Sequence, residues 1–367
     1  MNMPFLSSQM IGQIASDSRK MFVTFTIALS AGWACLYLGL PAPYLMGSLF
    51  GVWITGGLIK PMQPYLGVAR WFHVPVVLGL GVIIGAAFGG DFVAKATQWW
   101  TTALMMIITT IIVAVSSFIF LTKMRGYDHI MAYFCSIPGG QAEAIILARE
   151  MVEKDYVVAL FHLVRVVVVF VSTPFLLAFL QGQEAVINSN IALQALPSLW
   201  ALPASDLIIF LALALGGYGV AYMVRLPMAH LLGPMGASAI LHYLGLIDLP
   251  RVNEFVILAQ LAIGGAIGAR LSQVAFSELF VYVKDAILNC SLTLALFLSM
   301  AILISYLTDE RFLDIWLAFV PGGLYEVTLL GLVFGFDVAF IAFHHTTRIM
   351  LIFFSMPLAA AKLRQSV

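Results

Sequence analysis

Ten apolar runs, most of them about 20 residues long, constrain this chain more than any other feature. A helix needs about 20 apolar residues to cross roughly 30 Å of hydrocarbon. Only 10% of the residues are charged and 62% are hydrophobic, which excludes an ordinary soluble domain. We therefore expect an all-α polytopic membrane protein. The runs cover residues 22–40, 43–59, 71–90, 100–121, 156–180, 206–224, 228–246, 253–269, 285–307 and 337–360.

The charges and cysteines give no sign of nucleic-acid binding or of a metal site. The 18 lysines and arginines balance the 18 aspartates and glutamates, so nothing favours a nucleic-acid partner. The three cysteines are far apart and lack metal-ligand spacing, so we interpret them as core residues. Five tryptophans near the ends of runs are typical of anchors at the lipid–water interface: Trp33, Trp71, Trp99, Trp100 and Trp200.

The chain also repeats itself. Residues 138–174 align with residues 321–357 without a gap at a constant offset of 183, and 11 of the 37 positions are identical. The shared residues include Pro-Gly-Gly, a glutamate, a histidine and an arginine. Each Pro-Gly-Gly interrupts a shorter apolar stretch, at 129–149 and 312–335.

The repeat predicts how the chain is organised. We expect two membrane repeats of about five transmembrane helices each, and in each repeat a discontinuous helix broken by Pro-Gly-Gly. The expected ranges are an N-terminal cytoplasmic segment at 1–20, the first repeat at 21–180, a linker at 181–204, the second repeat at 205–360 and a cytoplasmic tail at 361–367.

The distribution of lysine and arginine favours inverted copies over parallel ones. If each interrupted stretch is a re-entrant hairpin, each copy crosses five times, and 13 cations fall inside against 3 outside. If each interrupted stretch crosses, the count is 10 against 6. An odd number of crossings also inverts the second copy without an additional helix. Both arrangements leave Arg165 and Arg348 within the membrane.

The Pro-Gly-Gly breaks are the first candidate site. Non-helical chain persists at membrane depth only where protein or a water-filled cavity covers it. We expect each proline in the first turn of a new helix, whose N-terminus directs partial positive charge at an anion. The alternative is that each break is only a kinked loop. The candidate substrate-binding residues at the breaks are Pro138, Gly139, Gly140, Pro321, Gly322 and Gly323.

Deep charges accompany each break. Arg165 and Arg348 lie about ten residues into their runs, roughly 15 Å deep, where an unpaired charge is costly. We expect them to bind a substrate anion, and the alternative is that each pairs with Glu143 or Glu326 to hold a hairpin. Those glutamates lie one turn into the half-helices, where a carboxylate either binds a coupling proton or Na⁺ or only caps the helix.

His162 and His345 precede the two arginines by three residues, on the same helical face. We consider them as proton carriers, against the alternative that they are ordinary core histidines. His344 has no counterpart in the first copy and carries no weight in the prediction.

The whole chain resembles the AbrB-type integral membrane proteins of bacteria, which are also labelled ammonia monooxygenases. The likeness rests on the duplicated layout, the two breaks SIPGG and VPGG, and the HxxR pattern followed by proline in each closing helix. It also rests on LPAPYLMGSL at 40–49 and LPMAHLLGPM at 226–235. The resemblance implies a multi-pass protein of the bacterial inner membrane, and the cation count places both termini in the cytoplasm.

We weigh three functions. The leading hypothesis is a secondary transporter, in which the two copies rock or slide past each other to move a small anionic solute by alternating access, coupled to H⁺ or Na⁺. The second is a membrane sensor with an indirect role in the regulation of gene expression. The third is a metal-dependent membrane monooxygenase, because two glutamates and two histidines offer ligands for iron or copper.

We expect no enzymatic activity and no cofactor, because the arginine beside each would-be metal ligand repels a cation. The expected partners are the solute, the coupling ion and the lipid bilayer. The sequence leaves both a monomer and a homo-oligomer open.

Overall fold

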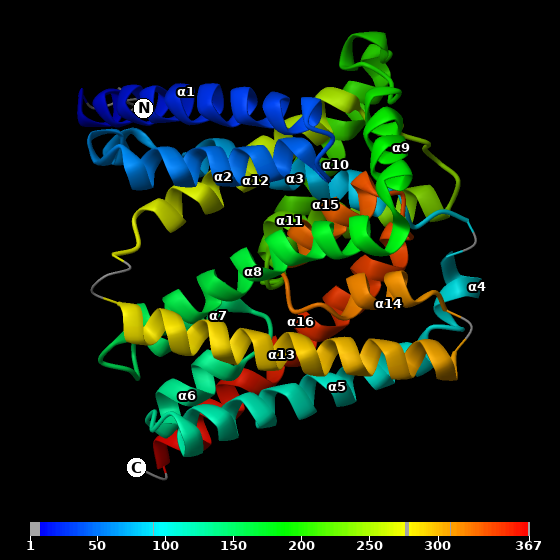
Figure 1. Cartoon of the computed structure of the whole chain (residues 1–367). Coiled ribbons are helices and arrows are strands. Elements are labelled where there is room, and N and C mark those ends of the chain that lie inside the picture. Colours follow the sequence, from blue (N-terminus) through cyan, green and yellow to red (C-terminus); the bar gives the residue numbers. More distant parts are fainter. Residues whose placement is uncertain (1–7, 91, 276–278, 309, 366–367) are drawn as a thin grey trace, which may run out of the picture.

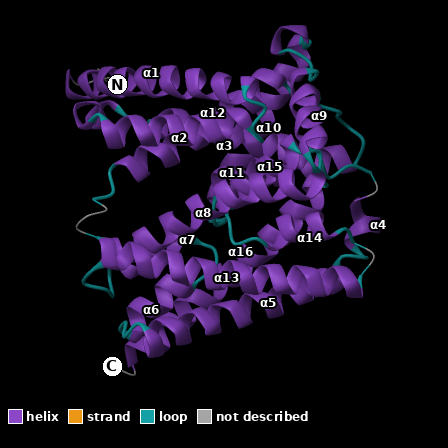
Figure 2. Cartoon of the chain, in the orientation of Figure 1, coloured by secondary structure: helices purple, strands orange, loops and turns teal. Residues whose placement is uncertain are grey.

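The computed structural model describes residues 8–90, 92–275, 279–308 and 310–365, and every regular element in these ranges is a helix (Figures 1 and 2). The predicted all-α class is confirmed. Residues 1–7 of the predicted N-terminal segment and residues 366–367 of the predicted tail lie outside the described residues.

The helices are α1 (Ser8–Tyr37), α2 (Pro43–Leu58), α3 (Arg70–Gly85), α4 (Phe92–Ala96), α5 (Trp100–Ile119), α6 (His129–Ser136), α7 (Gln141–Ala148), α8 (Asp155–Gln181), α9 (Gln183–Gln194), α10 (Ala204–Met223), α11 (Ala229–Tyr243), α12 (Asn253–Ser272), α13 (Phe280–Leu307), α14 (Phe312–Phe319), α15 (Leu324–Val333) and α16 (Val338–Gln365). Short single turns occur at Lys60–Tyr65, Phe120–Met124 and Leu199–Ala201.

Seven of the described helices are long and apolar enough to cross a membrane, namely α1, α5, α8, α10, α12, α13 and α16. The runs predicted at 43–59, 71–90 and 228–246 form the shorter helices α2, α3 and α11, of 16, 16 and 15 residues. In α3 every residue from Val76 to Gly85 is buried. Neighbouring helices surround this part of α3. A helix that is shielded from lipid in this way can be shorter than the roughly 20 residues that a lipid-exposed span needs. The predicted linker 181–204 contains helix α9.

The helices form two bundles (Figure 1). We call α1, α2, α3, α10, α11 and α12 the first bundle, and α5 to α8 with α13 to α16 the second bundle, because these helices pack mainly within each set. Few contacts join the bundles, chiefly those of α3 and α12 with α8, α15 and α16. Each sequence copy therefore contributes helices to both bundles. The boundary between the bundles does not coincide with the boundary between residues 21–180 and 205–360.

Glycines bring the helices of the first bundle close together. A Cβ atom on Gly81 of α3 would lie 2.7 Å from the carbonyl oxygen of Leu231 in α11. A Cβ on Gly264 of α12, 183 residues later, would lie 2.7 Å from the carbonyl oxygen of Leu45 in α2. Only a residue without a side chain permits such an approach. In this bundle each copy packs a glycine-bearing helix against the other copy.

The two interrupted stretches fold back on themselves. The rings of Tyr127, before α6, and Tyr156, after α7, each lie 6.4 Å from the ring of Tyr282. In the second copy, the Arg311 guanidinium before α14 lies 5.9 Å from the ring of Phe336 after α15. Both α6–α7 and α14–α15 are therefore hairpins whose two ends lie together. Figure 1 shows α6 and α7 towards one end of the second bundle and α14 towards the other.

Candidate functional site

Both Pro-Gly-Gly breaks meet at one cavity of about 120 Å³. Its walls come from the second bundle, except for two residues of the first bundle at and beside the start of α11. Eight of the predicted site residues line it: Gly139, Gly140, Glu143, Arg165, Gly322, Gly323, Glu326 and Arg348. The other four, Pro138, Pro321, His162 and His345, are not among its lining residues. The fold thus brings together residues that are 183 positions apart in the chain.

The helices after the breaks begin later than predicted. Gly140 is the N-cap of α7 and has a left-handed backbone with φ of 54°, whereas Gly323 is the N-cap of α15 with φ of −76°. Pro138 and Pro321 precede these N-caps by two residues, so the prediction that they lie in the first helical turn is wrong. The two glycines after each proline form the turn, and the backbone becomes helical only after it.

The two arginines hold the carbonyl groups at the ends of α6 and α14. Arg165 Nη1 donates to the carbonyl oxygen of Ile137. Arg348 Nη1 donates to the carbonyl oxygens of Phe319 and Val320 at 2.8 and 3.1 Å, and Nη2 donates to that of Gly322 at 3.3 Å. The carbonyl groups of Ile137, Phe319 and Val320 lie at helix ends, where acceptors lack helical partners. The carbonyl group of Gly322 lies in the break, and that of Val320 also accepts from the Gly322 N–H at 2.8 Å. Within the described residues neither arginine forms an ion pair with a glutamate.

Each guanidinium also keeps one donor free. The Nε atoms of Arg165 and Arg348 are buried and have no hydrogen-bond partner among the described residues. Arg348 is only 1% exposed, and its Nε lies 3.7 Å from the position that a Cβ would occupy on Gly139. The arginine of the second copy therefore faces the break of the first copy. A buried N–H without a partner is costly, so each is a donor available to a ligand.

The two histidines are fully engaged in hydrogen bonds. His162 Nε2 donates to the carbonyl oxygen of Phe134 at 3.1 Å, and His162 Nδ1 accepts from Arg165 Nη2 at 3.0 Å. His345 Nε2 donates to Leu317 at 2.9 Å, and its Nδ1 accepts from the Arg348 side chain at 2.9 Å. With both nitrogens used, the arrangement favours the alternative that these are core histidines with satisfied hydrogen bonds, and it gives no support to a proton-carrying role. Their bonds also orient the two arginines.

The two glutamates fold back towards the start of their own helices. Glu326 is 3% exposed, and its carboxylate lies so close to Gly323 that a Cβ there would collide with it. Glu143 is half-buried, and its Oε2 lies 3.7 Å from where a Cβ on Gly140 would be. Both carboxylates thus lie near a positive helix N-terminus. Glu326 Oε2 has no hydrogen-bond partner among the described residues.

A larger cavity of about 580 Å³ adjoins the first one, with Gln141, Val166, Tyr325 and Glu326 lining both. It lies between the two bundles and extends to Gln273–Ala275 at the end of α12. Its walls include two residues that the sequence analysis missed, His73 and Arg270. The offset of 183 aligns them with Val256 and Ala87, so the repeat gave no signal for either.

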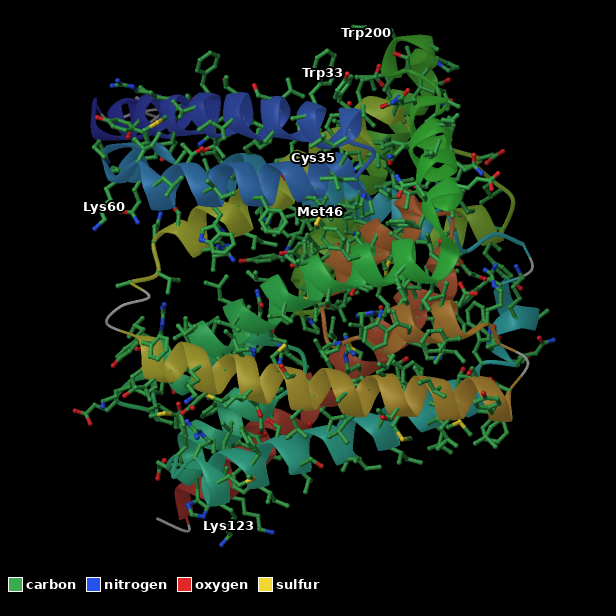
Figure 3. The ribbon with its side chains drawn as sticks, in the orientation of Figure 1. Trp33, Cys35, Met46, Lys60, Lys123 and Trp200 are labelled. Carbon is green, nitrogen blue, oxygen red and sulfur yellow. The ribbon has the colours of Figure 1, made fainter. Side chains whose placement is uncertain are left out.

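Aromatic side chains pack around Trp99, just before α5. Trp99 lies 6.0 Å from Phe92, 5.3 Å from Phe340 and 5.6 Å from Phe343, measured between ring centroids. Trp99 is 4% exposed, so its predicted place at the lipid interface is wrong. Trp33 and Trp200, in contrast, point away from the helices at the surface (Figure 3).

Comparison with known proteins agrees with the resemblance noted from the motifs. Residues 49–364 match the model of a family described as "Transition state regulatory protein AbrB". The chain is 24% identical to YhjN of Bacillus subtilis (strain 168), covering 94% of this chain and 90% of that protein. It is also 24% identical to the "Putative regulator AbrB" of Escherichia coli (strain K12), covering 93% of this chain and 94% of that one. No solved structure matches significantly. Because the family model covers most of its length, the chain belongs to the AbrB family of helical, membrane-type proteins.

Proposed function

We propose that this protein is a secondary transporter of a small anionic solute and has no catalytic role. The observation that carries the proposal is the 120 Å³ cavity, where two helix breaks and two buried guanidinium groups converge. Paired helix N-termini at an interrupted segment are a common device of transporters for holding an anionic group. Two free Nε donors supply the directed hydrogen bonds that a carboxylate accepts.

The proposed topology is a pair of inverted copies with re-entrant hairpins, in the bacterial inner membrane, with both termini cytoplasmic. The hairpin geometry of α6–α7 and α14–α15 supports it, as does their placement towards opposite ends of the second bundle (Figure 1). Lys60, after α2, and Lys123, after α5, lie towards the same end of the molecule as the start of α1 and the end of α16 (Figures 1 and 3). A cation-rich end is the signature of a cytoplasmic face.

The proposed movement takes place between the two bundles instead of between the two sequence copies. All the breaks and both arginines belong to the second bundle, and few contacts join it to the first. The larger cavity gives the site access from the end near α12 and α8. Alternating access would then close this end and open the opposite one. The coupling ion would be H⁺ or Na⁺, bound through Glu143 or Glu326.

A sensor is the second candidate, because the family description and one relative's name refer to regulation. A sensor could bind the same anion without moving it across the membrane. A measurement of anion flux therefore distinguishes a sensor from a transporter. The oxygenase hypothesis gains no support, since the His162 and His345 nitrogens already bond to carbonyl groups and arginines.

Uptake into proteoliposomes tests the proposal. A panel of radiolabelled small carboxylates should include at least one that accumulates saturably under an imposed H⁺ or Na⁺ gradient. Arg165→Lys should abolish this uptake, because lysine has no fork to hold the carbonyl and the anion together. Arg149→Ala, at an exposed arginine 3.3 Å from Asp155, is the control and should transport normally. Gradient-independent binding without accumulation would favour the sensor.

A further inference from the structure

Glu326 already occupies the place at which an anion would bind. It is the third residue of α15, and its carboxylate lies against Gly323, the N-cap of that helix. A carboxylate at this position is stabilised by the positive end of the helix. The missing side chain of Gly323 leaves the space that the carboxylate fills.

A solute carboxylate would require the same space. The donors it would use are the free Nε of Arg348 and the start of α15, and both border the cavity that Glu326 also lines. The cavity has a volume of about 120 Å³. Two carboxylates this close together do not both ionise readily, because like charges disfavour the charged form. Either the solute is excluded, or Glu326 becomes neutral.

The charges around Glu326 come from every helix that contributes to the two cavities. Arg348 lies on α16, Arg270 on α12, His73 on α3, His230 on α11 and Glu143 on α7, while α8 carries Arg165, His162 and Tyr156. Tyr325 is its neighbour on α15 itself, and neither α9 nor α14 supplies a residue to these two cavities within the described chain. Two arginines and two glutamates therefore balance one another in the small cavity. Exchange of one carboxylate charge for another keeps that balance.

We propose that Glu326 is an internal substitute for the substrate: the solute carboxylate takes its place at Gly323 and Arg348 as Glu326 takes up one proton. The proposal rests on the proposed anion site and assigns its coupling ion as H⁺. The proton comes from the bulk solution by way of the larger cavity and binds a carboxylate oxygen of Glu326, which becomes neutral. No other bond in the protein or the solute changes. The charge of the site is the same before and after binding, and one proton accompanies each carboxylate.

Glu326 fits this role better than its counterpart Glu143. Glu326 lines both cavities, so it contacts the anion site and the larger cavity together, whereas Glu143 lines only the smaller one. Glu143 is also half-buried and lies further from its glycine.

The experiment counts protons during binding of a named probe, acetate, to the full-length protein in weakly buffered detergent. Equilibrium dialysis of radiolabelled acetate gives the amount bound, and a pH electrode gives the protons taken up. The wild-type protein should take up about one proton per acetate, and its affinity should fall by up to about tenfold per pH unit as the pH rises. Glu326→Gln should bind acetate with no proton uptake and little pH dependence.

One comparison variant makes the result specific. Glu150→Gln, at an exposed glutamate that lines neither cavity, should retain proton uptake. Acetate binding without proton uptake by the wild-type protein would overturn this inference and leave the anion site intact. Proton uptake that persists in Glu326→Gln would overturn it as well. No acetate binding at any pH would instead count against the proposed anion site itself. The number of protons taken up by the wild-type protein is measured without any variant. The proposal can therefore still be overturned by that measurement if Glu326→Gln fails to fold.

Discussion

The two breaks have the same Pro-Gly-Gly motif, yet the structure holds them differently. Gly140 turns through a left-handed conformation, whereas Gly323 is extended. Arg165 holds one carbonyl group and Arg348 holds three. Glu143 is half-buried and Glu326 is 3% exposed. The second break is therefore the more tightly enclosed one. The difference teaches that a shared motif does not imply equal roles, because the side chains of the second break are held by more hydrogen bonds and are more deeply buried than those of the first.

The largest expected effect is on the stability of the second break. Arg348→Ala would leave the buried carbonyl groups of Phe319 and Gly322 without a donor, while that of Val320 keeps the Gly322 N–H, and each orphaned group costs about 1–3 kcal/mol. Arg165→Ala leaves one such group, so its cost should be smaller by about 1–3 kcal/mol. Thermal unfolding in detergent, followed by tryptophan fluorescence, measures both. Equal losses of stability would show that the two breaks are enclosed alike.

The next effect concerns access from water. Ala159 lines the larger cavity, whereas Ala342, 183 residues later, is fully buried. In a background without Cys35, Cys135 and Cys290, a water-soluble maleimide should label Ala159→Cys roughly 100-fold faster than Ala342→Cys, a difference of about 2.7 kcal/mol in opening free energy. Mass spectrometry of the labelled protein gives the rates. Similar rates at both positions would contradict the one-sided opening.

The smallest effect separates the two glycines. Gly140→Ala places a side chain on a left-handed backbone and should cost about 1 kcal/mol whatever residue 143 is. Gly323→Ala should cost more, because the methyl group collides with the Glu326 carboxylate. Removing that carboxylate with Glu326→Ala should relieve the collision, with a coupling energy of about 0.5–3 kcal/mol in a double-mutant cycle of thermal stabilities. The corresponding cycle for Gly140 and Glu143 should give a coupling near zero. A larger coupling energy for Gly140 and Glu143 than for Gly323 and Glu326 would mean that the carboxylate of Glu143 is the one packed tightly against its glycine.

The sequence revealed the candidate site because its main residues occur twice at one offset. Arg165 and Arg348, or Glu143 and Glu326, need no structure to be paired, and both pairs line the same cavity. Residues present in one copy gave no such signal: Arg270 aligns with Ala87, and His73 with Val256. The hydrogen-bond partners of the arginines could not be predicted either. Arg348 donates to main-chain carbonyl groups, which every residue has, so no residue type in the sequence identifies them.

Helix packing was predicted less well than helix location. Every one of the ten runs contains a helix, but burial allows α2, α3 and α11 to be shorter than a bilayer requires. The exchange of helices between copies was not foreseen, because it depends on which glycine faces which helix. A tryptophan at the end of a run looks like an interface anchor, and only the fold shows that Trp99 lies among phenylalanines.

The central claim is that the two breaks form one shared anion site, and acetate binding to single arginine variants tests it most directly. Equilibrium dialysis of radiolabelled acetate against wild-type protein, Arg165→Lys, Arg348→Lys and the surface control Arg149→Ala gives the four affinities. Because both guanidinium groups line the same cavity, either lysine substitution should weaken binding at least about tenfold, while the control binds like the wild type. Binding that survives in Arg165→Lys or in Arg348→Lys would contradict the account, since the two breaks would then not share a ligand.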